Sequence, residues 1–341
     1  MRIAALPIDD PRWSAFVDSH PDAGPFHLPA WASMIAECYH FHAFALAAID
    51  TDGELLAGLP ALTVRSPLGA RRWVSLPFTD WCPPLIRADV AAADVFDAVG
   101  EYVLAGPVRE LEVRSALPPA PDSHPMAVGY LHTMALPPEP AMIHPRKSHR
   151  NNRNQALRSG LRVTRGSTPQ DVAAFYEVHT LTRRRHGVPV QPRRFFDLLR
   201  ARLLVPGHGF VATARLEGEV LSAAVFLDHN GTLVNKYHGS DPRLPDKRAG
   251  YLIDWEMMVF GCTSGHHTMD MGRSDPDAAG LRHYKSAWGT VETPLVYTHV
   301  CRNPPRLPHD SRVGVLSRQI IRRSPPWICR AVGEVLYRWA A

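Results

Sequence analysis

Two short stretches near the end of the chain decide the fold: Met269-Asp270-Met271-Gly272-Arg273-Ser274 and Tyr284-Lys285-Ser286-Ala287-Trp288-Gly289. An acid, a glycine, an arginine and a serine stand too close together in the first stretch for it to be an ordinary buried strand. We therefore predict that a strand ends there and opens onto a polar cavity, with a surface turn as the alternative. Lys285 lies on the next element and would meet the same cavity.

The composition is that of an ordinary globular protein. At 341 residues the chain exceeds the usual size of a single core, so we expect two domains. Five cysteines lie far apart without a Cys-x-x-Cys pair, which argues against a zinc cluster or a disulfide framework and fits a reducing compartment. No stretch reads as a signal peptide or as the run of about 20 apolar residues that spans a bilayer. We expect a cytoplasmic protein without a metal site, either free or peripheral at the inner face of the membrane.

The positive charge is unevenly placed. The net charge is only +5, but residues 144–165 hold seven lysines and arginines and no acid. Residues 306–341 hold seven arginines against Asp310 and Glu334. Such blocks are typical of proteins with an anionic partner, namely phosphate, a lipid surface or nucleic acid, and the alternative for each block is a solvated helix face.

The two opening stretches also carry a family resemblance. A strand ending in Asp-(aromatic or aliphatic)-Gly-Arg-Ser, followed by (aromatic)-Lys-x-x-Trp-Gly, resembles the Fem-type branch of the GNAT acyltransferase superfamily, which includes aminoacyl-tRNA-dependent peptidoglycan bridge enzymes and BioF-like or CelD/BcsL-type acetyltransferases. The resemblance covers residues 25–300. The other matching stretches, in the same order, are Pro29-Ala30-Trp31, Leu76-Pro77-Phe78-Thr79-Asp80-Trp81, the basic run from Arg146 to Ala156, His186-Gly187-Val188-Pro189 and Tyr237-His238-Gly239-Ser240.

The order of predicted elements agrees with the fold that this resemblance implies. Helices and strands alternate in both halves, with a hairpin around Asp50-Thr51-Asp52-Gly53 and a helix that begins at Thr168. Many prolines in 116–140 predict an irregular passage between domains. We predict an α/β (α+β) protein of tandem GNAT-like domains with mixed sheets flanked by helices. The predicted parts are a degenerate N-terminal domain (1–140), the acyltransferase domain (141–303) and a basic amphipathic helical tail (304–341).

Asp270, Arg273 and Lys285 form the best candidate site. Acyl transfer to an amine requires a deprotonated amine, a polarised carbonyl and a donor held in line. The resemblance implies that Lys285 stabilises the carbonyl or a phosphate. We assign Arg273 to substrate anchoring and Asp270 to orienting Arg273, with Ser274 and Tyr284 as neighbouring substrate contacts. The alternative is a buried Asp-Arg-Lys network that only closes the sheet.

Other candidates lie along the second half. Tyr237 is a catalytic candidate that would bond the acyl carbonyl or the leaving group, and His238 is a candidate base near neutral pH. Glu256 is a second candidate base. Histidines are more often structural than catalytic, and the chain has 18 of them. The remaining candidates for substrate contact are His186 and Trp255.

The donor is expected at a helix start, where backbone N–H groups and the helix dipole favour a pyrophosphate. The resemblance implies that Arg248, Gly250 and Tyr251 bind it. The sequence departs from the Arg/Gln-x-x-Gly-x-Gly/Ala signature of acetyl-CoA binding because it has only one of the two glycines. The donor is therefore left open between acyl-CoA and aminoacyl-tRNA, and an ordinary solvated helix start is the alternative.

Two basic segments could contact a larger partner. Lys147, Arg150 and Arg153 recur at helical spacing and favour a track for tRNA backbone or a lipid-linked phosphate, or else a solvated face. In the tail, two candidate helices flank Pro325-Pro326, and in the second of them Trp327, Ala331, Val335 and Trp339 recur every fourth residue. Such a helix suits an anionic membrane surface or a groove on the body of the protein.

We therefore predict an N-acyltransferase that moves an acetyl or aminoacyl group to an amine of an envelope- or polysaccharide-related acceptor. The long helical hairpin of the bridge-forming enzymes has no counterpart here, so modification of a polysaccharide or envelope glycan is an equal candidate. The alternative is a non-catalytic tRNA- or nucleic-acid-binding protein, or a peripheral membrane adaptor, that retains the fold.

Overall fold

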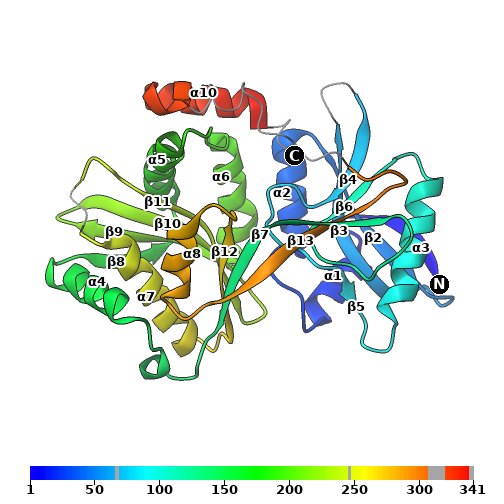
Figure 1. The fold of residues 1–341 in the computed structure, drawn as a ribbon, viewed down its shortest axis with the longest axis horizontal. Helices are drawn as coiled ribbons and strands as arrows, with labels where there is room; N and C mark the ends of the chain where they lie inside the picture. The colour runs from blue at the N-terminus through cyan, green and yellow to red at the C-terminus, as the bar shows by residue number, and fades with distance from the viewer. Residues whose placement is uncertain (66–68, 245–246, 306–318, 338–341) are drawn as a thin grey trace. The chain divides into compact units, whose positions relative to one another are not determined.

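The computed structural model of the protein describes residues 1–65, 69–244, 247–305 and 319–337 (Figure 1). These fall into two compact units. The first contains Met1–Tyr130 and the described part of Pro294–Pro308, and the second contains Leu131–Thr293 and the described part of His309–Tyr337. The predicted ranges differ from these units, since 294–303 count with the first unit and the described tail with the second.

The first unit is built on one sheet. Its strands follow the order β1 (Arg2–Pro7), β2 (His42–Ile49), β3 (Leu55–Arg65), β4 (Arg71–Ser75), β6 (Leu111–Val113) and the last residues of β13 (Val291–Val300), with the short β5 (Leu85–Ile86) paired to β3. The helices of this unit are α1 (Pro11–Ser19), α2 (Pro29–Tyr39) and α3 (Ala92–Ala105). Phe44, Trp73 and Val99 belong to the core between the sheet and α3.

The predicted hairpin around Asp50 is confirmed. β2 and β3 pair antiparallel, and the Asp50 carboxylate accepts hydrogen bonds from the backbone N–H groups of Asp52 and Glu54 at 2.9 Å each. Gly53 has a φ of +92°, a conformation that a side chain would disfavour. The turn therefore follows directly from the local sequence.

The predicted irregular passage over 116–140 is wrong for most of its length. Residues Ser123–Ala135 form the long strand β7. Three prolines of the segment precede the strand, and Pro125 is only its third residue, where a missing N–H group is tolerated. Residues 126–135 contain no proline that would interrupt the backbone hydrogen bonds of the strand. The proline content of the whole segment therefore gave the wrong prediction for these residues.

The second unit has a mixed sheet in the order β12 (Thr268–Ser274), β11 (Thr232–Ser240), β10 (Glu219–His229), β9 (Gly209–Leu216) and β8 (Arg162–Gly166). In Figure 1, α5 and α6 lie on one side of these strands and α4 and α7 on the other. Their bounds are α4 (Lys147–Arg158), α5 (Pro169–His186), α6 (Arg193–Leu199, extended by the π-helical turn Arg200–Leu204) and α7 (Ala249–Thr263). The predicted α/β class, with mixed sheets flanked by helices, is confirmed.

Local signals set several boundaries of the second unit. Thr168 and Asp171 form a reciprocal capping box at the start of α5, as the sequence predicts, and Gly187 ends that helix in the left-handed conformation. Apolar side chains of α7 and the strands fill the core on one side of the sheet, Ile253, Met258 and Phe226 among them. The short helix α8 (Ala279–Ser286) follows β12 and carries Tyr284 and Lys285.

The predicted helix after Pro325 is confirmed as α10 (Pro326–Leu336). Trp339 and most of the helix predicted before Pro325 lie outside the described residues. None of the helices in the described ranges combines the length and the hydropathy that crossing a lipid bilayer requires.

Candidate active site

The site is built where two parallel strands end. β11 and β12 pair in parallel over three residues only, and the register stops at Val234 opposite Asp270. Beyond that point β11 continues to Ser240 and β12 to Ser274. The ends of parallel strands expose backbone groups that no neighbouring strand satisfies, and polar side chains from the following helices meet them there.

A bulge in β11 decides which of its side chains reach the site. The pairing with β10 passes from Asn235 to Tyr237 and leaves Lys236 as the extra residue. Strand residues normally alternate between faces, so a bulge lets two side chains three residues apart share one face. Asn235 and His238 consequently both contact the α7 side, whereas Tyr237 lies on the other side.

Asp254 of α7 is the centre of the polar cluster. Its side chain is fully buried, with 1% of the residue exposed. Tyr284 donates its hydroxyl to one carboxylate oxygen at 2.5 Å, and Asn235 donates its amide to the other at 3.1 Å. One residue from each of β11, α7 and α8 is therefore fixed in a single hydrogen-bonded group.

Burial raises the pKa of the Asp254 carboxyl above its usual range, although His238, Tyr284 and Lys285 act against it. Burial and the neighbouring Asp254 carboxylate together raise the pKa of the Tyr284 phenol well above its ordinary value. A buried carboxyl with a raised pKa, next to a histidine, is a combination that recurs at sites of proton transfer.

His238 connects this cluster to the start of α7. Its Nε2 atom lies 2.9 Å from the Ser222 hydroxyl, and a Cβ atom at Gly250 would lie 3.3 Å from the same nitrogen. Burial lowers the pKa of the His238 imidazole, against the pull of Asp254. The imidazole is therefore neutral at pH 7 and available as a base.

Lys285 holds the end of β12. Its ammonium group donates to the backbone carbonyls of Gly272 at 2.9 Å and Arg273 at 2.8 Å, and 6% of the residue is exposed. Asp270 accepts a hydrogen bond from the Gly272 N–H at 2.6 Å. Asp270 and Lys285, both predicted from sequence, thus meet at the same turn, in which Gly272 has a φ of +73°.

The other two residues predicted here, Arg273 and Ser274, lie in different environments. Arg273 pairs with Asp275 at 2.8 Å and its side chain is one-third exposed. Ser274 is buried, and its hydroxyl has no hydrogen-bond partner among the described residues. His132 of β7 is fully buried, and burial followed by the charge of Lys285 lowers its pKa to about 4, so it is neutral beside the ammonium group.

Tyr237 has a different environment from the rest. Its ring lies within a cluster of aromatic side chains from α5 and α6, with ring centroids 5.5 Å from Phe196, 5.6 Å from His179 and 6.1 Å from Phe195. The structure therefore separates Tyr237 from Asp254 and Lys285 by the thickness of the strand.

The predicted donor loop borders a cavity. Its volume is about 340 Å³, and Arg185, Lys247, Ala249 and Gly250 are among its lining residues. Arg248 caps α7 in the left-handed conformation, with a φ of +61°. Tyr251 points to the polar cluster instead, with its ring 5.0 Å from that of Tyr284. Two cations and the first N–H groups of a 15-residue helix suit a diphosphate.

The basic helix α4 lies on the same side of the sheet. Arg153 stacks on Trp255 of α7 at 4.2 Å, while Arg150 and Lys147 are exposed. Buried His149 contacts the backbone carbonyl of Tyr284 at 2.9 Å and so ties α4 to the cluster. Glu256, beside Trp255, has a pKa raised by burial. His186 is exposed at the end of α5.

Sequence reasoning missed Asp254, Asn235 and Ser222. Asp254 stands one residue before the predicted pair Trp255 and Glu256, within an apolar helix. The available signal was that Asp254 shares one helix face with the apolar residues Tyr251 and Met258. Asn235 could not be found, because its orientation depends on the bulge.

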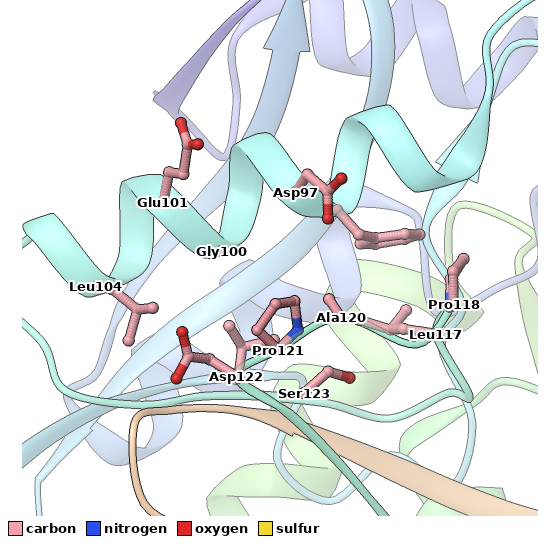
Figure 2. Close-up of a pocket in the computed structure, with 12 residues that line it drawn as sticks. Asp97, Gly100, Glu101, Leu104, Leu117, Pro118, Ala120, Pro121, Asp122 and Ser123 are labelled. Carbon is pink, nitrogen blue, oxygen red and sulfur yellow. The ribbon is translucent and has the colours of Figure 1, made fainter.

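A second cavity, of about 330 Å³, lies in the first unit and contains no predicted site residue. Figure 2 shows Asp97 and Glu101 on α3 and Asp122 beyond the proline-rich turn, around an apolar floor that includes Leu104 and Leu117. No group of three or more histidine, cysteine, aspartate or glutamate side chains within the described ranges could hold a metal ion.

Comparison with known proteins identifies the second unit. Residues 144–286 match the acetyltransferase (GNAT) domain family. No curated protein matches the sequence. The crystal structure of FemX is similar over 87% of this chain and 97% of that chain, at 15% identity and a TM-score of 0.68.

Two further solved structures share the fold. The C-terminal domain of a putative lysylphosphatidylglycerol synthetase from Agrobacterium fabrum is 12% identical, with 91% and 95% of the two chains covered and a TM-score of 0.56. A tandem GNAT protein from the clavulanic acid biosynthesis pathway is 11% identical, with 89% and 99% covered and a TM-score of 0.51. The predicted resemblance is confirmed: the chain carries a GNAT acyltransferase domain within a fold that it shares with FemX.

Proposed function

We propose that the protein is an N-acyltransferase whose acid–base chemistry is carried out by His238 and Asp254. The observation that carries this proposal is the buried cluster of Asp254, Tyr284 and Asn235 beside His238, at the end of the parallel strands. It brings a neutral imidazole, a carboxyl with a raised pKa and the start of α7 together on one side of β11.

The roles follow from protonation states. An attacking amine must lose a proton, and the neutral His238 imidazole can accept it, with Asp254 stabilising the resulting positive charge. Lys285 places a fixed positive charge and holds the carbonyls at the end of β12, so we propose that it stabilises the developing oxyanion. Asp270 fixes the same turn, and Arg273 with Ser274 would anchor the acceptor. We assign Tyr237 no proton-transfer role, because its neighbours are aromatic.

Acyl-CoA is the proposed donor. Arg185 and Lys247 beside the first turn of α7 provide charge and N–H groups for its diphosphate, and Gly250 keeps that turn close to His238. Aminoacyl-tRNA is the second candidate, favoured by the exposed Lys147 and Arg150 on α4. The same basic helix would favour a non-catalytic RNA-binding protein if the chemistry were absent.

The proposed acceptor is an amine of an envelope- or polysaccharide-related molecule that carries phosphate. Exposed cations on α4 and the one-third-exposed side chain of Arg273 support an anionic acceptor. A lipid-linked acceptor would require a peripheral position at the inner face of the membrane, for which the basic tail is the supporting feature.

The decisive experiment measures which donor gives up its acyl group to an amine. Acetyl-CoA is incubated with the protein and a panel of amino sugars and amino-sugar phosphates, and amine-dependent release of free CoA thiol is measured. A parallel reaction uses labelled aminoacyl-tRNA with the same amines. Lys285→Ala is expected to lower the rate by about 10²–10³ in the productive arm, because a pre-aimed positive charge is lost.

Thermal unfolding of the same variant separates chemistry from folding. We expect its midpoint to stay within a few degrees of that of the parent protein, and the same holds for Arg273→Ala, which should also lose activity. Unfolding of both variants at much lower temperature would instead identify the Asp270–Arg273–Lys285 region as a purely structural network. Salt-sensitive tRNA binding without acyl transfer from either donor would favour the RNA-binding alternative.

A further inference from the structure

The helix α10 has two apolar faces, and only one of them packs on the protein. Cys329 and Gly333 are buried, and Tyr337 just beyond the helix is buried too. These three residues recur at four-residue spacing and form one stripe. A Cβ atom at Gly333 would lie only 1.8 Å from the carbonyl oxygen of Val190, so the helix backbone closely approaches that segment.

Hydrogen bonds keep this inner face in place. Arg183 of α5 donates to the Tyr337 hydroxyl at 3.0 Å, and Arg184 donates to the carbonyl of Ser324. Glu334 accepts from the backbone N–H of Arg193 at 3.2 Å. The only acid of α10 is therefore directed toward the protein.

The opposite face of α10 is apolar and exposed. Trp327 is 65% exposed and Val335 is 60% exposed, and Ala331 lies between them, also exposed. We call these three residues the outer stripe. They are four residues apart and thus lie one above another on the helix. The sequence pattern singles out the outer stripe. The stripe that packs on the protein, however, is the one that contains Cys329 and Gly333.

Exposed arginines precede the outer stripe, while Glu334, the one acid of α10, is also exposed and bonds to the backbone N–H of Arg193. Arg322 and Arg323, in the preceding turn, are both exposed. The sequence from 306 to 341 contains seven arginines and two acids. A second copy of this basic surface would be repelled, whereas an anionic surface would be attracted.

We propose that the outer stripe of α10 docks on an anionic lipid membrane, with Trp327 and Val335 entering the boundary between headgroups and acyl chains and Arg322 and Arg323 contacting the headgroups. A short helix with one apolar face, a tryptophan at its start and nearby arginines suits that interface. The inner stripe meanwhile keeps the helix attached to α5. This inference extends the proposed peripheral position but does not depend on acyl transfer.

Vesicle flotation of the full chain tests the proposal directly. Phosphatidylcholine vesicles with and without phosphatidylglycerol are compared at low salt. We expect binding to the anionic vesicles only, weakened by added salt because of screening. Trp327→Ser combined with Val335→Ser should lower the partition coefficient at least tenfold, since two exposed apolar side chains leave the interface.

A matched control is available in the same unit. Val205 is 58% exposed, close to the value for Val335, and belongs to neither α10 nor the candidate active site. Val205→Ser should leave vesicle binding unchanged. All variants should keep the unfolding midpoint of the parent chain, because each substituted side chain is more than half exposed.

Three results would overturn the proposal: equal binding of the double variant and the parent, equal binding to neutral and anionic vesicles, or no vesicle binding by the parent chain. Sedimentation velocity adds a further arm. A dimer that the double variant converts to a monomer would show that a second copy covers the outer stripe instead.

Discussion

The two sides of β11 are built from the same strand but have opposite chemistry. On the α7 side, Asn235 donates a hydrogen bond to Asp254, and the His238 imidazole interacts electrostatically with the same carboxyl. On the α5 side, Tyr237 and His179 pack among phenylalanines. Burial lowers the pKa of the histidine on each side, so that shift alone does not mark a functional group. The nearby Asp254 carboxyl and the close approach of Gly250 at the start of α7 distinguish His238 from His179.

The largest effect is expected at Asp254. Asp254→Asn keeps the size of the side chain and can still bond Tyr284 and Asn235, but it cannot stabilise a positive His238. We expect amine-dependent CoA release to fall by about 10²–10³, with little change in the unfolding midpoint. Glu256→Gln, two residues further along α7, is the matched control and should stay within about threefold of the parent. Equal losses in both variants would contradict the special role of Asp254.

His238 and Tyr237 give the next contrast. His238→Gln should lower the rate roughly a hundredfold, whereas Tyr237→Phe should change it by less than about threefold. In the parent protein the rate should fall as the pH drops below the lowered pKa of His238, because only the neutral imidazole accepts a proton. A pH–rate profile measures both points. A larger loss for Tyr237→Phe would return the catalytic role to Tyr237.

Two glycines sharpen the comparison further. A Cβ atom at Gly239 would lie 2.7 Å from the backbone of His179, and one at Gly250 would lie 3.3 Å from the His238 ring. Gly239→Ala should lower the free energy of unfolding by about 1–3 kcal/mol, because backbone must move. Gly250→Ala should chiefly lower the rate of acyl transfer. The new methyl group displaces the His238 ring, and a side chain can shift without unfolding the protein. Denaturant unfolding measures the stability of both variants, and the transfer assay measures their rates. A loss of rate alone in Gly239→Ala, or a loss of stability alone in Gly250→Ala, would contradict the prediction.

The smallest effect concerns His179. Burial, followed by the charge of Arg183, lowers its pKa to about 3. The unfolded chain takes up this proton below about pH 6.5, so the stability that the neutral form contributes is present above that pH and is lost as the pH falls toward 3. The slope is about 1.4 kcal/mol per pH unit at most. In His179→Phe the free energy of unfolding should depend less on pH between 6 and 4, and an unchanged slope would contradict this.

Much of the fold was predictable because its signals are local. The capping box of Thr168 and Asp171, the Asp50 turn and the helix after Pro325 each depend on a few neighbouring residues. The strand β7 was missed because proline content was averaged over a segment whose prolines lie mainly outside the strand, before and after it. Asp270 and Lys285 were found together because the stretches that carry them also carry the family resemblance.

The sequence by itself determined the class of fold, the order of most elements and the meeting of Lys285 with the end of β12. Only the tertiary structure decided that a bulge at Lys236 aligns Asn235 with His238, and that Asp254 is the buried acid between them. It also decided which stripe of α10 packs inward. The physical reason is the same in each case: which face a side chain occupies depends on register and on close backbone approach, and both are set by distant segments of the chain.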